Sequence, residues 1–335
     1  MPNNNFIAEP ASQRVRRDDR SQSRPVFFKS LSRIVASVAL LLASSAAFAA
    51  DVPGKKSPPA PPEASQACLE KNGLVNDVFG FNGGSDVNDW KGLSLSGTYG
   101  GSFGTRAGYL NSHSGNLQAT YSPYPCVEVD PYVFGGVTGS KTFGVKSNGS
   151  TEGAGIELKY KLLGRDPHGF GLTFDLVLQG AATNGAYYTV VGRSDNVYDT
   201  AFSIFADKEL VAGKLYGALN VSYDWNFQDL GGPRNGYANT SIARFGAALA
   251  YQISDGLFVG AEGSHFRRYD SMAFNKQLGY ATFLGPNFYW AFTKSWALSG
   301  AWNLQVDGRA KGTRNDLDLT NFSQHIVKLK LNHDF

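Results

Sequence analysis

The sequence predicts an all-β fold, a transmembrane antiparallel up-and-down β-barrel of twelve strands within a range of about ten to fourteen. Three observations predict it. Segments of about ten residues alternate apolar and polar side chains and are divided by polar turns. The connections between these segments are alternately short and long. The chain then ends in one more alternating segment, which closes on the aromatic residue Phe335.

The alternation is clearest in residues 215–225. Leu219 and Trp225 fall on one face of a strand there, and Asn220 and Asp224 fall on the other, because side chains alternate across a strand. A soluble sheet would bury the apolar face in a shared core, whereas a membrane barrel turns it outward. Periodicity alone leaves both readings open, and the ends of the chain favour the membrane.

The same pattern gives twelve candidate strands and sorts their connections. Connections after the even strands are short turns, and those after the odd strands run about ten to sixteen residues and are rich in Gly, Asn, Ser and Asp, as in membrane barrels. The expected strands lie near 91–103, 115–123, 127–137, 152–163, 169–180, 197–207, 214–226, 241–253, 256–266, 279–292, 295–306 and 324–335.

The front of the chain predicts export. The apolar run from Ile34 to Ala43 follows Lys29 and Arg33 and precedes Ala47-Phe48-Ala49, the pattern of a cleaved signal peptide. A transmembrane helix needs ~20 apolar residues, and this run is half that length. The expected division is a signal peptide with an extended N-region at 1–49, a Pro-rich linker and N-terminal segment at 50–90, and the barrel at 91–335.

Charge excludes one class of function. Residues 1–49 hold seven of the 31 basic residues and three of the 28 acidic ones, which leaves 24 and 25 after cleavage. The remaining chain is therefore close to neutral, and nothing in it indicates a nucleic-acid partner. Cys68 and Cys126 both lie in the exported part, where an oxidising compartment favours a disulfide between them over two free thiols.

The final segment is also informative about the kind of protein to which the chain is similar. Val327 and Leu329 alternate with Lys328 and Lys330 up to Phe335. This ending resembles the closing strand of a Gram-negative outer-membrane β-barrel. The resemblance implies location in the outer membrane, contact with its lipid and lipopolysaccharide, and a terminal Phe335 read by the barrel-assembly machinery.

Two narrower resemblances follow. Ala50-Asp51-Val52-Pro53 with its Pro-rich sequel resembles the mature start of alphaproteobacterial outer-membrane barrels. Residues 283–290, FLGPNFYW, resemble a strand of barrels associated with aromatic-compound (phenol) degradation pathways, without any ligand residue to carry over.

Charged side chains predicted on the inner face are candidates for a solute path. Their signs are mixed, so they either pair across the lumen or line a small, weakly selective aqueous passage. Small inward residues such as Ala218, Ala248 and Ala250 leave room and favour a narrow pore, although residues 65–90 or an inward loop would block it. The lumen candidates are Glu157, Lys159, Lys161, Asp175, Asp224, Arg244, Glu262, Asp307, Lys328 and Lys330.

The sequence therefore predicts passive passage of small solutes. One alternative is a non-conducting structural or surface-recognition barrel that acts through its extracellular loops. The other is an enzyme that modifies lipid or lipopolysaccharide, but Ser264 and His265 are neighbours on one strand and point to opposite faces, so they cannot form a nucleophile–base pair. No catalytic, cofactor-binding or metal-ligating residues are expected.

Overall fold

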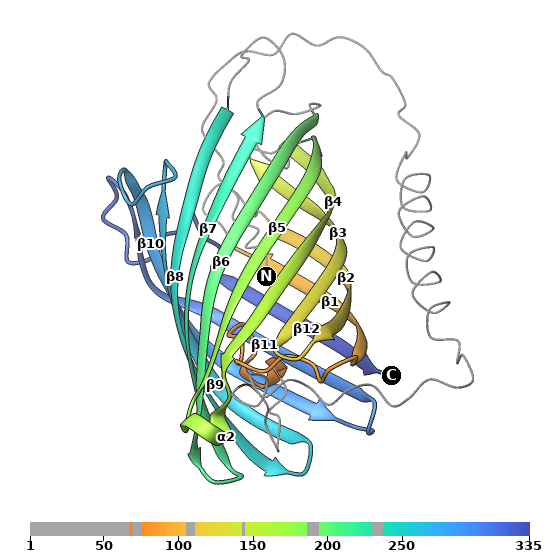
Figure 1. Cartoon of the computed structure of the whole chain (residues 1–335). Coiled ribbons are helices and arrows are strands. Elements are labelled where there is room, and N and C mark those ends of the chain that lie inside the picture. Colours follow the sequence, from red (N-terminus) through yellow and green to blue (C-terminus); the bar gives the residue numbers. More distant parts are fainter. Residues whose placement is uncertain (1–67, 69–75, 105–110, 143–144, 186–193, 230–236) are drawn as a thin grey trace, which may run out of the picture. The chain divides into compact units, whose positions relative to one another are not determined.

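The structure is a computed structural model that describes residues 68, 76–104, 111–142, 145–185, 194–229 and 237–335. Twelve strands close into an antiparallel barrel in which each strand pairs with its sequence neighbours and β1 pairs with β12 (Figure 1). The predicted fold class is confirmed. The predicted signal peptide lies outside the described residues, and among those described no helix is long and apolar enough to cross a bilayer.

The elements follow one another in this order: η2 (Asn76–Phe79), β1 (Leu93–Phe103), β2 (Asn111–Tyr124), β3 (Val127–Thr142), β4 (Val145–Leu163), α2 (Arg165–His168), β5 (Gly171–Gly185), β6 (Ser194–Val211), β7 (Leu215–Asp229), β8 (Tyr237–Ser254), β9 (Leu257–Tyr269), β10 (Gln277–Ala291), β11 (Trp296–Ala310) and β12 (His325–Asp334).

Several strands are longer than predicted. The β3–β4 hairpin pairs residue by residue up to Thr142 and Val145, whereas the sequence predicted a loop from about 138 to 151. Its Gly-, Ser- and Thr-rich stretch lacks an apolar face but still forms the backbone hydrogen bonds of an antiparallel ladder, which need no particular side chain. The boundaries between strands and loops therefore differ from those predicted from the sequence, while the number and order of the strands agree with the prediction.

The outer surface of the barrel is apolar and the inner surface is polar. On β7, Leu219 and Val221 are 55% and 51% exposed, while Asn220 between them is 3% exposed. This is the reverse of a soluble protein, and it suits a barrel whose outside meets lipid. The soluble alternative is therefore wrong for this chain.

The two ends of the barrel differ. The turn end carries the connections that follow the even-numbered strands, together with Cys126 and Phe335, and the loop end carries the connections that follow the odd-numbered strands. At the turn end the Phe335 amide donates to the Leu93 carbonyl at 3.1 Å, which joins the end of the chain to the start of β1. The Phe335 side chain is 76% exposed on the barrel. Its role as an assembly signal stays a prediction.

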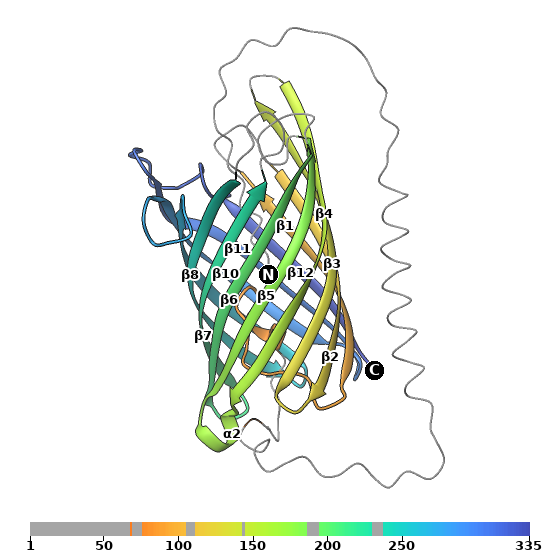
Figure 2. The same ribbon diagram turned by 45° about the horizontal axis from the view of Figure 1, so that its top comes forward.

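The segment before β1 lies inside the barrel. Figure 1 and Figure 2 both show η2 and the residues after it within the ring of strands, and η2 packs against β8, β9 and β10. A disulfide joins Cys68 to Cys126 at the β2–β3 turn, as predicted, with 5.8 Å between the Cα atoms. We call residues 76–92 the plug.

Candidate functional site

The plug packs on the part of the inner wall that carries small residues. Val78 and Phe79 are completely buried, and they form one hydrophobic cluster with Ala218, Ala248 and Ala250. The sequence prediction took these alanines as room for a pore. In the structure the plug fills that room, so the small side chains serve as its docking surface.

Gly80 lies close against the wall. A Cβ there would lie 2.8 Å from the Asn287 Cβ and 2.9 Å from the Ala301 Cβ, so no larger residue fits. Its φ of +71° also lies in the left-handed region that favours glycine. Lys328 Nζ donates to the Gly80 carbonyl at 2.8 Å, which fixes the turn after η2 to β12.

Glu262 on β9 holds the next residues of the plug. Its carboxylate accepts hydrogen bonds from the Phe81 amide at 2.9 Å and the Asn82 amide at 3.0 Å. Arg244 Nη2 on β8 donates to the Phe81 carbonyl at 3.0 Å and to Asn82 Oδ1 at 3.0 Å. Wall side chains of both charges thus satisfy the backbone of a segment that has no regular structure of its own.

The second half of the plug is bound near α2. Asp86 of the plug pairs with Lys161 on β4 and with Arg165 on α2, and Arg165 Nη1 also donates to Asp207 Oδ1 at 2.7 Å. The Ser85 amide donates to Asp207 as well. This buried network ties the plug to three wall elements, and charge-assisted bonds of this kind are the stronger ones.

Asp77 anchors the start of the plug to β12. Its carboxylate lies 2.9 Å from Lys330 Nζ and 3.9 Å from Lys328 Nζ. Burial alone would raise the pKa of Asp77, but the two ammonium groups outweigh it and hold that pKa below its ordinary value. Asp77 is therefore a carboxylate at neutral pH.

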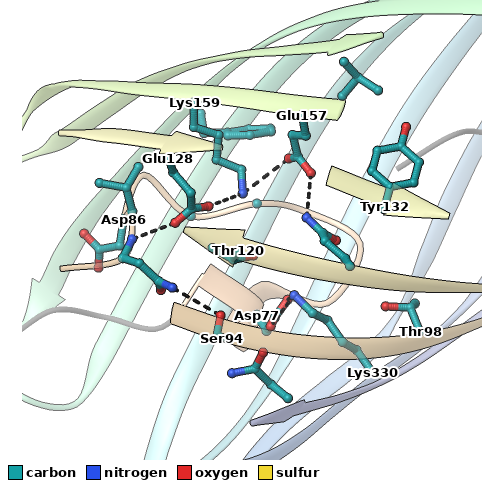
Figure 3. Close-up of a pocket in the computed structure, with 18 of the residues that line it drawn as sticks. Asp77, Asp86, Ser94, Thr98, Thr120, Glu128, Tyr132, Glu157, Lys159 and Lys330 are labelled. Carbon is teal, nitrogen blue, oxygen red and sulfur yellow. Dashed lines mark hydrogen bonds and ion pairs between the residues drawn. The ribbon is translucent and has the colours of Figure 1, made fainter. Parts of the chain in front are cut away.

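A further ionic cluster lies on the opposite wall. Lys159 Nζ on β4 lies 2.7 Å from Glu128 and 3.3 Å from Glu157 (Figure 3). It also lies 3.0 Å from Asp130. The Asn88 amide of the plug donates to Glu128 at 2.6 Å. The cluster therefore reaches the plug from the side away from the alanines.

A cavity of about 490 Å³ lies between the plug and the wall formed by β1–β8 and β12. Figure 3 shows Glu157, Lys159, Lys330 and Tyr132 around it. At the turn end of the barrel, Leu93 and Phe335 line the cavity.

A smaller hollow of about 110 Å³ continues toward the loop end. It shares Phe81, Thr98, Asn116 and Lys328 with the cavity. Its far wall includes Phe322, which lies in the connection between β11 and β12 and packs inward against the aromatic rings of β9 and β10.

The structure places the predicted lumen residues in three groups. Six line the cavity: Glu157, Lys159, Asp224, Arg244, Lys328 and Lys330. Two others, Lys161 and Glu262, bind the plug, and Asp175 is buried opposite Lys159 on the neighbouring strand. The sequence prediction missed the plug carboxylates Asp77 and Asp86, because nothing local marks an irregular segment as the partner of a distant strand.

The predicted orientation of Asp307 was wrong. This residue was predicted to face the lumen, but it is exposed on the outer face. The pairing of β10 with β11 shifts between Thr282 and Phe283, so Asp307 lies opposite Thr282 while Gln305 lies opposite Phe283. The bulge inserts one residue into β11 and reverses the alternation beyond it.

Ser264 and His265 do not form a catalytic pair. Ser264 is buried on the inner face, whereas His265 points outward and its Nδ1 lies 3.0 Å from Thr282 Oγ1. Among the described residues no group of three or more His, Cys, Asp or Glu is arranged to hold a metal ion.

Comparisons with known proteins agree with the fold. The model of a family of unknown function, DUF6662, matches residues 135–335. No curated protein matches the chain in sequence. An outer membrane channel from Pseudomonas putida F1 is similar in structure, with a TM-score of 0.51 and 13% identity over 75% of this chain and 98% of that one. The beta domain of the Bordetella autotransporter BrkA gives a TM-score of 0.50 and 11% identity over 73% and 100%.

Proposed function

The chain belongs to the DUF6662 family, whose function is unknown, and on that premise we propose that it is an outer-membrane channel for small polar solutes. The passage runs between the plug and the β1–β8 side of the barrel. The observation that carries the proposal is that the cavity and the smaller hollow meet around Phe81, Thr98, Asn116 and Lys328.

The lining supports polar solutes. The inner wall bears Thr98, Asn116, Gln118 and Thr120 on β1 and β2, and charged groups from β4, β7 and β12. A solute that gives up water on entry finds hydrogen-bonding groups on both the wall and the plug. The apolar outer face supports placement in a membrane, and the similarity of fold to outer-membrane barrels supports the outer membrane.

Phe81 is the narrow point of the proposed passage. It belongs to the plug, is half-buried and lines both spaces. Glu262 and Arg244 fix its backbone, so the ring can change position only by rotating about its own side-chain bonds. We therefore expect small conductance from the wild-type protein.

The test is single-channel recording in a planar bilayer with the mature chain. Stable small steps are expected, and Phe81→Ala should increase their size because it widens the narrow point. Phe202→Ala is the matched control, since Phe202 is exposed on the outer face and its loss should leave the steps unchanged. A folded barrel that stays silent in wild type and in Phe81→Ala would contradict the proposal.

One observation favours the second candidate, a barrel that recognises a partner through its loops. Phe274, in the β9–β10 connection, is 70% exposed, and the same connection is held to the wall by bonds from Tyr223 and Trp225 to the Met272 carbonyl at 3.0 and 3.2 Å. A rigid exposed aromatic suits a contact surface. If recognition through the loops is the main role, the wild-type protein should show no conductance. Phe274→Ser should then abolish its binding to whole cells.

A further inference from the structure

The cavity has an excess of negative charge. Its lining contains seven carboxylate side chains and four basic ones. Asp86 is already paired with Lys161 and Arg165 outside the lining, so two negative charges remain when all are ionised. The carboxylates are Asp77, Asp86, Asp89, Glu128, Glu157, Asp224 and Asp334, and the basic residues are Lys159, Arg244, Lys328 and Lys330. An excess of one sign of charge in a narrow space raises the local concentration of ions of the opposite sign.

The basic residues already donate to protein oxygens. Lys159 lies between three carboxylates, and Lys330 pairs with Asp77. Lys328 donates to the Gly80 carbonyl, and Arg244 donates to the plug at Phe81 and Asn82. An anion that entered would meet basic groups that already bond to protein oxygens, so the cavity is poorly suited to it.

A separate observation concerns neutral groups on the wall. Asn220 on β7 is 3% exposed, and its Nδ2 donates to the Gly83 carbonyl at 2.9 Å, which fixes the orientation of the amide. Its Oδ1 has no hydrogen-bond partner within the described chain. Asn116 Oδ1, also on the cavity wall, likewise lacks one there.

Both unpartnered atoms are acceptors, and a buried acceptor without a donor is costly. A ligand that completes them must bring N–H or O–H donors, and the excess of carboxylates in the lining favours a ligand of positive charge. A primary ammonium group meets both conditions, since it carries one positive charge and three donors.

We propose that the cavity takes small protonated amines and that the channel prefers cations to anions. This rests on the proposed function, because it names the solute class of the same passage. A volume of about 490 Å³ holds a short linear diamine with its water.

The test uses the full mature chain in a planar bilayer with a potassium chloride gradient. The reversal potential should have the sign of cation preference, several-fold over chloride. Addition of 1,4-diaminobutane at millimolar concentration should reduce the potassium current, whereas succinate at the same concentration should leave it unchanged.

Asp224→Asn should reduce both the cation preference and the block by the diamine. Asp307→Asn makes the same change on the outer face and should alter neither. Chloride preference, or a current indifferent to the diamine, would overturn the inference while the channel itself stood. Absence of any current from a folded barrel would instead overturn the proposed function, and the inference with it.

Discussion

Asn82 of the plug and Glu262 of β9 are joined by two hydrogen bonds to one carboxylate oxygen. Glu262 Oε2 accepts from the Asn82 amide at 3.0 Å and from Asn82 Nδ2 at 2.8 Å, and both residues are almost fully buried. A buried carboxylate without donors is strongly unfavourable. Wall and plug therefore depend on each other, and the barrel interior is complete only with the plug in place.

Glu262→Ala should release the first half of the plug. Hydrogen bonds to a charged group contribute about 1.5–3 kcal/mol each, and a net loss of about 3 kcal/mol changes an equilibrium by roughly two orders of magnitude. The fraction of time spent in a large open state should rise accordingly in single-channel records. Glu262→Gln keeps one acceptor oxygen and should show a smaller rise. Identical open fractions in wild type and both variants would refute the anchoring role of Glu262.

The alanine surface gives a second way to displace the plug. Ala250 is completely buried beside Phe79, and overpacking a tight site costs about 1–3 kcal/mol. Ala250→Phe should therefore expel η2 and make the segment around it sensitive to protease in detergent. Ala247→Phe lies on the same strand with its side chain on the exposed face, so it should leave the segment protected. Equal protection in the two variants would mean that Phe79 does not depend on this surface.

The sequence predicted the barrel well because its signal is local. The alternation of Leu219 with Asn220, repeated over twelve segments, fixes which side chains face lipid, and pairing between neighbours then fixes the order of strands. The bulge beside Phe283 shows the limit of this reasoning, since one inserted residue reverses the face of Asp307 without any change in composition.

The plug was beyond local reasoning for a different reason. Phe81 and Glu262 are 181 residues apart, and no periodic pattern links an irregular Gly-rich segment to a strand at that distance. The small residues on β7 and β8 were recognised and residues 65–90 were named as a possible block, but no local pattern predicted that Val78 and Phe79 would pack on those small residues. The space inside a barrel can hold either water or a segment of the protein, and only the contacts in the structure show which of the two it holds.

The disulfide should act as a tether. Cys68 and Cys126 are separated by 58 residues in sequence, and closing a loop of that size stabilises the folded state by about 4 kcal/mol in the chain-entropy model. Reduction should lower the temperature at which the barrel unfolds on a heat-modifiability gel and make brief large openings more frequent. The double variant Cys68→Ser/Cys126→Ser should behave as the reduced protein and ignore reductant. No difference between oxidised and reduced protein would exclude a tether.

Asp77 should make plug docking depend on pH. Lys330 and Lys328 hold its pKa below the ordinary value of 3.8, so the docked plug favours the carboxylate form. A group whose pKa is lowered on docking stabilises the docked state above its free pKa and loses that contribution as pH falls through the docked pKa. The open fraction should therefore be constant from about pH 7 to 5 and rise below about pH 4.

Asp77→Asn separates this effect from general acid unfolding. An amide cannot form the ion pair with Lys330, so the variant should already show the larger open fraction at neutral pH. It should then change less than wild type on acidification. A variant that opens at the same low pH, and to the same extent, as wild type would show that other carboxylates control the plug, with Asp86 at its far end the next to test.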